Sequence, residues 1–226
     1  MSKILEELEE LFKSETIKPS FEIVHVILAI FIFGENRDGI GRYRLEKELL
    51  IGSGTSKSLI KRLNKNINFI SVLDENIRKG HVLTKEGLIF LEKIKQKIPF
   101  IKEGDLSILQ ETIIDMENNK VCFCQVKNYG DKLTNGIEQR DAAIKVGGLG
   151  ATCLVYDGKQ LVFPSGYDVN TERADSIVNE KVYKYFKGEI NKLDSKLEPN
   201  DVVIIGLGAN FKKARLAAVN AALTLF

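Results

Sequence analysis

Basic, amide and hydroxyl side chains recur along residues 56–65 at a spacing that places them together on one side of a helix. The members of this stripe are Ser56, Lys57, Lys61, Asn64 and Lys65. Such side chains donate hydrogen bonds to phosphate oxygens and to the edges of bases in a major groove. Apolar residues fall on the opposite side and can pack inward: Leu59, Ile60, Leu63 and Ile67. The stripe therefore predicts a contact with nucleic acid.

Positive charge is concentrated around this stripe. Residues 35–85 carry 11 basic and 6 acidic residues, whereas the whole chain has a formal net charge of only +2. A local excess of cations is what a phosphate-facing surface requires. The further candidate contacts of this segment are Arg42, Arg44, Thr55, Arg78 and Lys79. We expect the two arginines near residue 43 to contact the DNA backbone, and Arg78 and Lys79 to reach adjacent phosphates or the minor groove.

The elements that must position these groups follow from apolar spacing and glycine. We expect a first helix over residues 20–33 that ends at Gly34, and Thr55 as the N-cap of a third. The expected helices are 20–33, 42–50, 56–66 and 84–97, with a hairpin over 69–83. Two short helices around a tight glycine-containing turn, followed by a hairpin, are typical of a winged helix-turn-helix domain. Residues 4–12 predict an amphipathic helix that either packs on the domain or forms a dimer contact.

A basic helix face on its own is more often a solvated surface than a binding site. Here the turn, the cap, the basic helix and the basic hairpin occur in order, which favours binding of double-stranded DNA. The alternatives are a winged helix used for protein contacts and one used for RNA. Duplex DNA is thus the predicted partner, and a dimer on a palindromic site is the geometry that suits such a small module.

The second half of the chain predicts a different architecture. The expected strands are 121–127, 151–157, 160–163 and 202–206, and the expected helices are 136–146, 171–187 and 211–225. Residues 157–159 form the hairpin turn, and residues 100–120 stay unassigned. The order β-α-β-β-α-β is that of a ferredoxin-like unit, here with an added C-terminal helix. The predicted fold class is α+β, with a winged-helix domain over residues 1–100 and a small α/β sandwich over 101–226.

Two glycine clusters mark candidate ligand contacts in this second domain. Backbone amides beside glycine at the start of a helix can bind an anion, and an arginine can join them. The candidate ligand-binding residues are Arg140, Asp141, Gly147, Gly148, Gly206, Gly208 and Asn210. The alternatives are tight turns that let helix and strand pack, and an exposed ion pair between Arg140 and Asp141. Phe211 stands where a dinucleotide motif requires glycine, and no Walker lysine follows.

Several classes of protein are excluded by what the sequence lacks. It contains no recognisable catalytic set, so we expect no enzyme, no catalytic residue and no cofactor. The three cysteines, Cys122, Cys124 and Cys153, predict buried thiols in a reducing, cytoplasmic compartment rather than a metal site. The apolar run over residues 23–33 is too short to cross a bilayer, and we interpret it as a buried core helix.

The first half resembles the winged helix-turn-helix domains of archaeal transcriptional regulators. The residues that carry this resemblance are GRYRLEKELLIGSGTSKSLIKRLNKN and HVLTKEGLIFLEKI, within residues 20–97. The second half, with GIEQRDAAIKVGGLGATCLVYDGKQLVFPSG and DVVIIGLGANFKKARLAAVNAAL, is similar to an uncharacterised domain fused to such winged helices. The resemblance implies the pairing of a DNA-binding regulator domain with this second domain, and it supplies no ligand or activity for the latter. By analogy with other small domains of this element order, we expect a homodimeric transcriptional regulator whose second domain senses an anionic small-molecule effector or dimerises. The alternative is a bifunctional protein whose second domain is an enzyme acting on a phosphorylated small molecule.

Overall fold

The structure is a computed structural model, and it divides into two compact units. The residues that it describes are 3–13, 18–73, 80–110, 112–113, 119–164 and 177–226. The first unit comprises residues 1–95 together with Phe226, and the second comprises residues 96–225. Both contain helices and antiparallel strands, so the chain is a mixed α+β protein. No helix in the described ranges combines the length and the apolar character that crossing a bilayer requires.

The first unit is mostly helical. Its elements are α1 (Lys3–Glu6), α2 (Glu9–Phe12), α3 (Ile23–Glu35), α4 (Arg42–Leu49), α5 (Ser53–Lys65), β1 (Ile70–Val72), β2 (His81–Leu83) and α6 (Lys85–Lys95). The core helix α3 is buried at nearly every residue from Val24 to Phe33. The helix continues through Gly34 to Glu35, so the predicted end at Gly34 is wrong. A Cβ at Gly34 would lie 2.4 Å from Cδ2 of Leu91, so this glycine permits close packing of α6.

Residues 4–12 form two short helices instead of the single helix that their periodicity predicts. Leu8, between α1 and α2, and Leu11 are fully buried within the first unit. Arg62 of α5 holds this segment in place, because its guanidinium donates to the carbonyl oxygens of Leu11 at 2.7 Å and Lys13 at 2.9 Å. Of the two alternatives for this segment, the structure therefore favours packing on its own unit.

His25 completes the N-terminal cap of α3 and must be neutral to do so. Its Nδ1 accepts a hydrogen bond from the backbone N–H of Glu22 at 3.0 Å, and the Glu22 carboxylate accepts from the backbone of His25. Burial lowers the pKa of His25, against the opposing charge of Glu22, and burial also lowers the pKa of His81. These are the only two histidines of the chain, and both lie in the first unit.

Both imidazoles are expected to titrate below about pH 6.5, the value of an unperturbed histidine. The folded state then binds fewer protons than the unfolded state, so stability rises with pH across this window. The contribution of the two histidines to the free energy of unfolding of the first unit should be fully present above about pH 6.5. It should decrease as the pH falls toward their folded-state pKa values. NMR titration of the ring C–H signals measures both midpoints, and a midpoint at or above the usual value would contradict this expectation.

The second unit is built on a five-stranded sheet. Its strands are β3 (Ile101–Glu103), β4 (Lys120–Val126), β5 (Gly150–Tyr156), β6 (Leu161–Val162) and β7 (Val202–Gly208). Its helices are α7 (Leu106–Leu109), a 3-10 turn over Gly130–Lys132, α8 (Ile137–Lys145), α9 (Glu180–Asn191) and α10 (Phe211–Leu223). The strands lie in the order β3-β4-β7-β5-β6, and all neighbours are antiparallel. The expected hairpin turn joins β5 to β6, with Gly158 at φ +99°.

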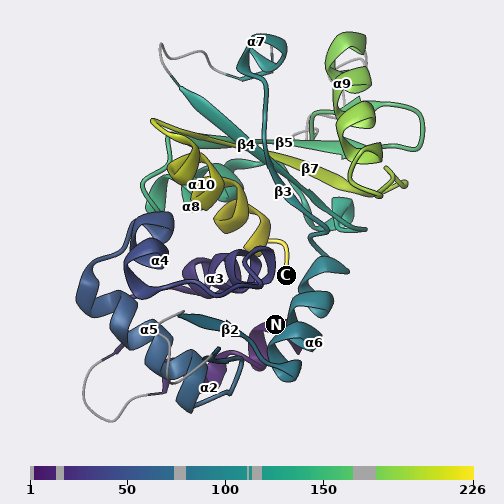
Figure 1. The fold of residues 1–226 in the computed structure, drawn as a ribbon. Helices are drawn as coiled ribbons and strands as arrows, with labels where there is room; N and C mark the ends of the chain where they lie inside the picture. Colours follow the sequence, from purple (N-terminus) through teal and green to yellow (C-terminus); the bar gives the residue numbers. More distant parts are fainter. Residues whose placement is uncertain (1–2, 14–17, 74–79, 111, 114–118, 165–176) are drawn as a thin grey trace. The chain divides into compact units, whose positions relative to one another are not determined.

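Helices cover both faces of this sheet (Figure 1). One face carries Phe123 and Ile205, which pack in a core cluster with Phe186 of α9. The other face is covered by α10 and α8. Along the chain, β4 to α10 follow the expected order, but the helices of a ferredoxin-like unit cover a single face. The ferredoxin-like expectation is therefore corrected: β7 lies between β4 and β5, and α8 and α9 cover opposite faces.

The start of α9 also differs from the sequence-based expectation of a helix over 171–187. Residues 171–176 lie outside the described residues. Ile177 forms an isolated bridge with Val162, and the side chain of Asn179 accepts the backbone N–H of Lys181 at 2.8 Å. Because Asn179 caps the helix, α9 begins at Glu180 and runs to Asn191.

Candidate nucleic-acid interface

The exposed face of α5 carries three lysines in a row. Lys57, Lys61 and Lys65 are spaced by one helical turn each, and all three are exposed. On the opposite side, Leu59 and Leu63 are fully buried. Helix periodicity produces this division, because residues four apart lie on the same side of a helix. The three lysines are the centre of the candidate interface.

Ser56, which the sequence pattern placed in this stripe, lies in the core instead. Its side chain is fully buried, and its hydroxyl donates to the carbonyl oxygen of Arg42 at 3.4 Å. The reason is its spacing: Ser56 precedes Leu59 and Leu63 by three and seven residues, so it shares their buried face. Ser56 therefore links α4 and α5 through this hydrogen bond, and it is removed from the candidate contacts.

The helix α5 also begins earlier than its sequence predicts. Gly52 occupies the N-cap position without a side-chain cap, and the first turn starts at Ser53. Thr55 therefore lies inside this turn and is not the cap; its Oγ1 is 2.7 Å from Oγ of Ser20. The first N–H groups of a helix lack partners within it, so an exposed first turn is suited to an anion. Ser53 and Gly54 are exposed there, and the sequence pattern did not indicate either of them.

The N-terminus of α4 adds two arginines and an aromatic ring. Arg44 is exposed, and Arg42 is half-buried with its guanidinium carbon 4.8 Å from the ring centroid of Tyr43. The ring itself is 69% exposed. Sequence reasoning overlooked Tyr43, although its position between two arginines at a helix start was a usable signal. Asn64 is half-buried and borders the lysine row.

The hairpin that follows α5 is formed by β1 and β2. Their register pairs Ile70 with Leu83 and Val72 with His81. Arg78 and Lys79, the predicted contacts at the hairpin tip, lie outside the described residues. Thr84 caps α6 as expected, because its Oγ1 accepts the backbone N–H of Gly87 at 3.1 Å.

The second glycine cluster of this unit, one of the two candidate ligand contacts, packs against a helix. Gly206 and Gly208 are buried residues of β7, covered by the backbone of α10. Asn210 caps α10, because its side-chain oxygen accepts the backbone N–H of Lys213 at 3.0 Å. Close packing against α10 therefore explains both glycines, and the packing alternative is favoured for them.

The first glycine cluster has a similar explanation. Gly147 adopts φ +82° in the turn after α8, and a Cβ at Gly148 would lie 2.6 Å from the Cβ of Ala217. Arg140 donates to the carboxylate of Asp141 from Nε at 3.0 Å and from Nη2 at 2.9 Å. Both side chains are exposed, so a surface ion pair is the favoured interpretation of this motif.

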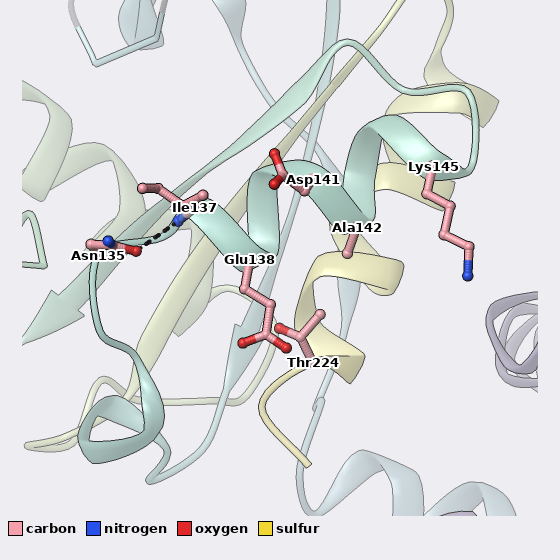
Figure 2. Close-up of a pocket in the computed structure, with 7 residues that line it drawn as sticks. All are labelled: Asn135, Ile137, Glu138, Asp141, Ala142, Lys145 and Thr224. Atoms are coloured by element: carbon pink, nitrogen blue, oxygen red, sulfur yellow. Dashed lines mark hydrogen bonds between the residues drawn. The ribbon is translucent and has the colours of Figure 1, made fainter.

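At least two shallow hollows are lined by described residues of the second unit. The first, of about 650 Å³, lies beside α8 (Figure 2) and is lined by Asn135, Ile137, Glu138, Asp141, Ala142, Lys145 and Thr224. It carries more acidic than basic side chains, which disfavours an anionic effector. The second, of about 560 Å³, is lined by Tyr156, Tyr183, Lys187, Asn191, Asp194, Ser195, Lys196 and Leu197. Neither hollow includes the glycines that the sequence pattern selected.

The three cysteines are free and buried, as their sequence context predicted. Burial raises the pKa of Cys122 and of Cys153 to about 12, and it raises that of Cys124 as well. At neutral pH these thiols are therefore protonated, and a protonated thiol is a poor nucleophile. Within the described residues no group of cysteine, histidine and acidic side chains is arranged to hold a metal ion.

Comparison with known proteins relates the second unit to a family of domains. Residues 116–225 match a family model described as "Domain of unknown function (DUF4443)". The fold of nearly the whole chain is similar to that of "Hypothetical protein PH0730 from Pyrococcus horikoshii OT3", with a TM-score of 0.62 and 22% sequence identity. The similarity covers 91% of this chain and 93% of that archaeal protein. No match was found among curated proteins.

Proposed function

We propose that residues 20–97 form a winged helix-turn-helix domain that binds double-stranded DNA. The observation that carries the proposal is the exposed row of Lys57, Lys61 and Lys65 on α5, opposite a fully buried apolar face. The helix follows α4 after a short turn, and a β-hairpin and α6 come next, which is the order of a winged helix. In this proposal α5 enters the major groove and its lysines contact base edges and phosphates.

The arginines of α4 complete the proposed footprint. Arg44 and the first turn of α5 contact the phosphate backbone, and Tyr43 with Arg42 forms a flat, cationic surface beside them. Arg78 and Lys79 stay predicted contacts of the wing. The proposed role of the protein is transcriptional regulation, with the second unit as its sensing or dimerising domain. The burial of Gly206 and Gly208 argues against the enzyme alternative, which relied on the loop from Gly206 to Asn210.

The lysine row provides the test of this proposal. Combined replacement of Lys57, Lys61 and Lys65 by alanine is expected to weaken binding to a labelled duplex of random sequence by at least about tenfold. The dependence of log K on log salt should also flatten, by about 0.9 for each phosphate that the variant no longer neutralises. Fluorescence anisotropy at several salt concentrations measures both quantities.

The matched control removes the same charge elsewhere on the surface. Alanine at the exposed Lys132, Lys159 and Lys181 lowers the net charge equally and should leave duplex affinity within about twofold. Equal weakening in both triple variants, or none in the α5 variant, would remove the assignment. If a hairpin RNA outcompetes duplex DNA, the same surface would be assigned to RNA binding instead of DNA binding. Selection of bound sequences from a random duplex pool would then define the site that is recognised.

A further inference from the structure

The outward face of α8 is apolar at its two ends and charged at its centre. Ile137 and Ile144 are 49% and 50% exposed, although each is a large aliphatic side chain. Between them, Arg140 and Asp141 have side chains that are 54% and 60% exposed. At about 100° per residue these four positions lie on one side of the helix. We call these four residues the α8 face.

The opposite side of α8 is occupied by packing within its own unit. Ala143 is fully buried and Gln139 is 2% exposed, with its Nε2 donating to Oγ1 of Thr224 at 2.6 Å. In Figure 2, Glu138 and Ala142 turn toward Thr224, while Asp141 points away from it. The core of the unit therefore does not explain why isoleucine stands at residues 137 and 144.

The order of residues on the α8 face is symmetric under a twofold axis. The sequence from residue 137 to residue 144 is Ile-x-x-Arg-Asp-x-x-Ile, and its midpoint lies between Arg140 and Asp141. If a second copy of α8 runs antiparallel about that midpoint, each isoleucine meets the other isoleucine of the second copy. Each arginine then meets an aspartate, so all charges are matched. Self-complementarity of this kind is what an isologous dimer interface requires.

We propose that the α8 face binds the α8 face of a second copy of this chain. Antiparallel pairing removes four half-exposed isoleucines from water, two from each copy. It also converts two exposed neighbouring ion pairs into one network of four alternating charges, which stabilises more than an isolated surface pair. Charge at the centre fixes the register, because a shift along the helix would bring like charges together.

The proposed contact is small. One short helix from each copy buries less than a standard protein interface, so we expect the dimer to dissociate reversibly on dilution. The proposal does not depend on DNA binding, since it concerns the second unit alone. If both proposals hold, the dimer presents two basic helices to one palindromic site.

Charge reversal with mixing tests the pairing directly. Full-length protein with Arg140→Asp carries two aspartates at the centre of the α8 face, and protein with Asp141→Arg carries two arginines. Each variant alone is expected to be monomeric in sedimentation velocity at concentrations where the unmodified protein is dimeric. An equal mixture of the two, and the double variant R140D/D141R, should regain the dimer. Dimerisation upon mixing also establishes that both single variants are folded.

A second pair of variants tests the apolar ends. Ile144→Arg is expected to raise the dimer dissociation constant on the order of 100-fold, because the substitution occurs twice in a symmetric interface. Leu88→Arg, at an equally exposed position of α6, is the control and should leave the dissociation constant within about twofold. A protein that is monomeric at all concentrations, or dimers that none of the α8 variants weakens, would overturn the proposal.

Discussion

Replacement of Gly206 by alanine is expected to unfold the second unit under conditions where the unmodified protein is stable. A Cβ at this position would lie 2.3 Å from the backbone nitrogen of Ala218, 2.5 Å from the backbone oxygen of Ala214 and 2.7 Å from Cα of Ala218. All three atoms belong to the backbone of α10, so no side-chain rotation relieves the overlap. The helix would have to move off the centre of the sheet, at a cost of about 4 kcal/mol or more.

Urea denaturation measures this destabilisation. Far-UV circular dichroism is the signal to follow, because the chain contains no tryptophan for fluorescence. Gly188→Ala is the matched control, because Gly188 lies within α9 and a Cβ there meets no atom within 4 Å. Alanine exceeds glycine in helix propensity, so this control should gain about 0.5–1 kcal/mol. If the free energy of unfolding of Gly206→Ala lies within about 1 kcal/mol of that of the unmodified protein, the close approach of α10 to β7 is contradicted.

The second large effect is expected at Asp201, whose carboxylate is fully buried beside β7. Its Oδ2 accepts hydrogen bonds from Nε2 of Gln125 at 2.7 Å, from Nζ of Lys127 at 2.9 Å and from the backbone N–H of Glu198 at 2.8 Å. Its Oδ1 accepts the backbone N–H of Asn128 at 2.9 Å. One side chain thus joins the end of β4 to the segment that leads into β7.

Asp201→Ala is expected to lower the free energy of unfolding of the second unit by about 3–5 kcal/mol. The substitution removes the acceptor of four hydrogen bonds and leaves a partly buried lysine and a buried amide without it. Glu180→Ala is the control, since its carboxylate forms only an exposed ion pair with Lys184 and should cost no more than about 0.5 kcal/mol. Equal destabilisation by the two variants would show that the buried network contributes little. The destabilisation by Asp201→Asn should lie between those of Asp201→Ala and Glu180→Ala. The amide keeps one oxygen that accepts hydrogen bonds, but its nitrogen cannot accept one.

The faces of α5 were predictable because they depend on local periodicity. Residues on a helix advance by about 100° each, so the burial of Leu59 and Leu63 already requires the exposure of Lys57 and Lys61. The same rule assigns Ser56 to the buried side. The prediction for Ser56 was wrong because it followed the residue type and not the helical position. A hydroxyl is usually exposed, but here the carbonyl oxygen of Arg42 accepts its hydrogen bond.

The position of β7 was not predictable from local patterns. Val202–Gly208 is apolar on both faces, which is sufficient to predict a buried strand. Which strands become its neighbours depends on packing over long separations in the chain, and β7 lies between β4 and β5 although α8, β6 and α9 separate these elements in sequence. The role of Gly206 follows from the same fact, because only the finished sheet brings α10 onto this residue.

The amino-acid sequence alone is sufficient for the positions of most helices and strands, the concentration of positive charge near α5, and the buried state of the cysteines. These properties depend on residue type and on neighbours within a few turns. Tertiary packing alone decides the strand order of the sheet, the burial of Ser56, the contacts of Asp201 and the outward direction of Ile137 and Ile144. Each of these depends on which distant segment excludes water from a side chain, and no local pattern specifies that segment.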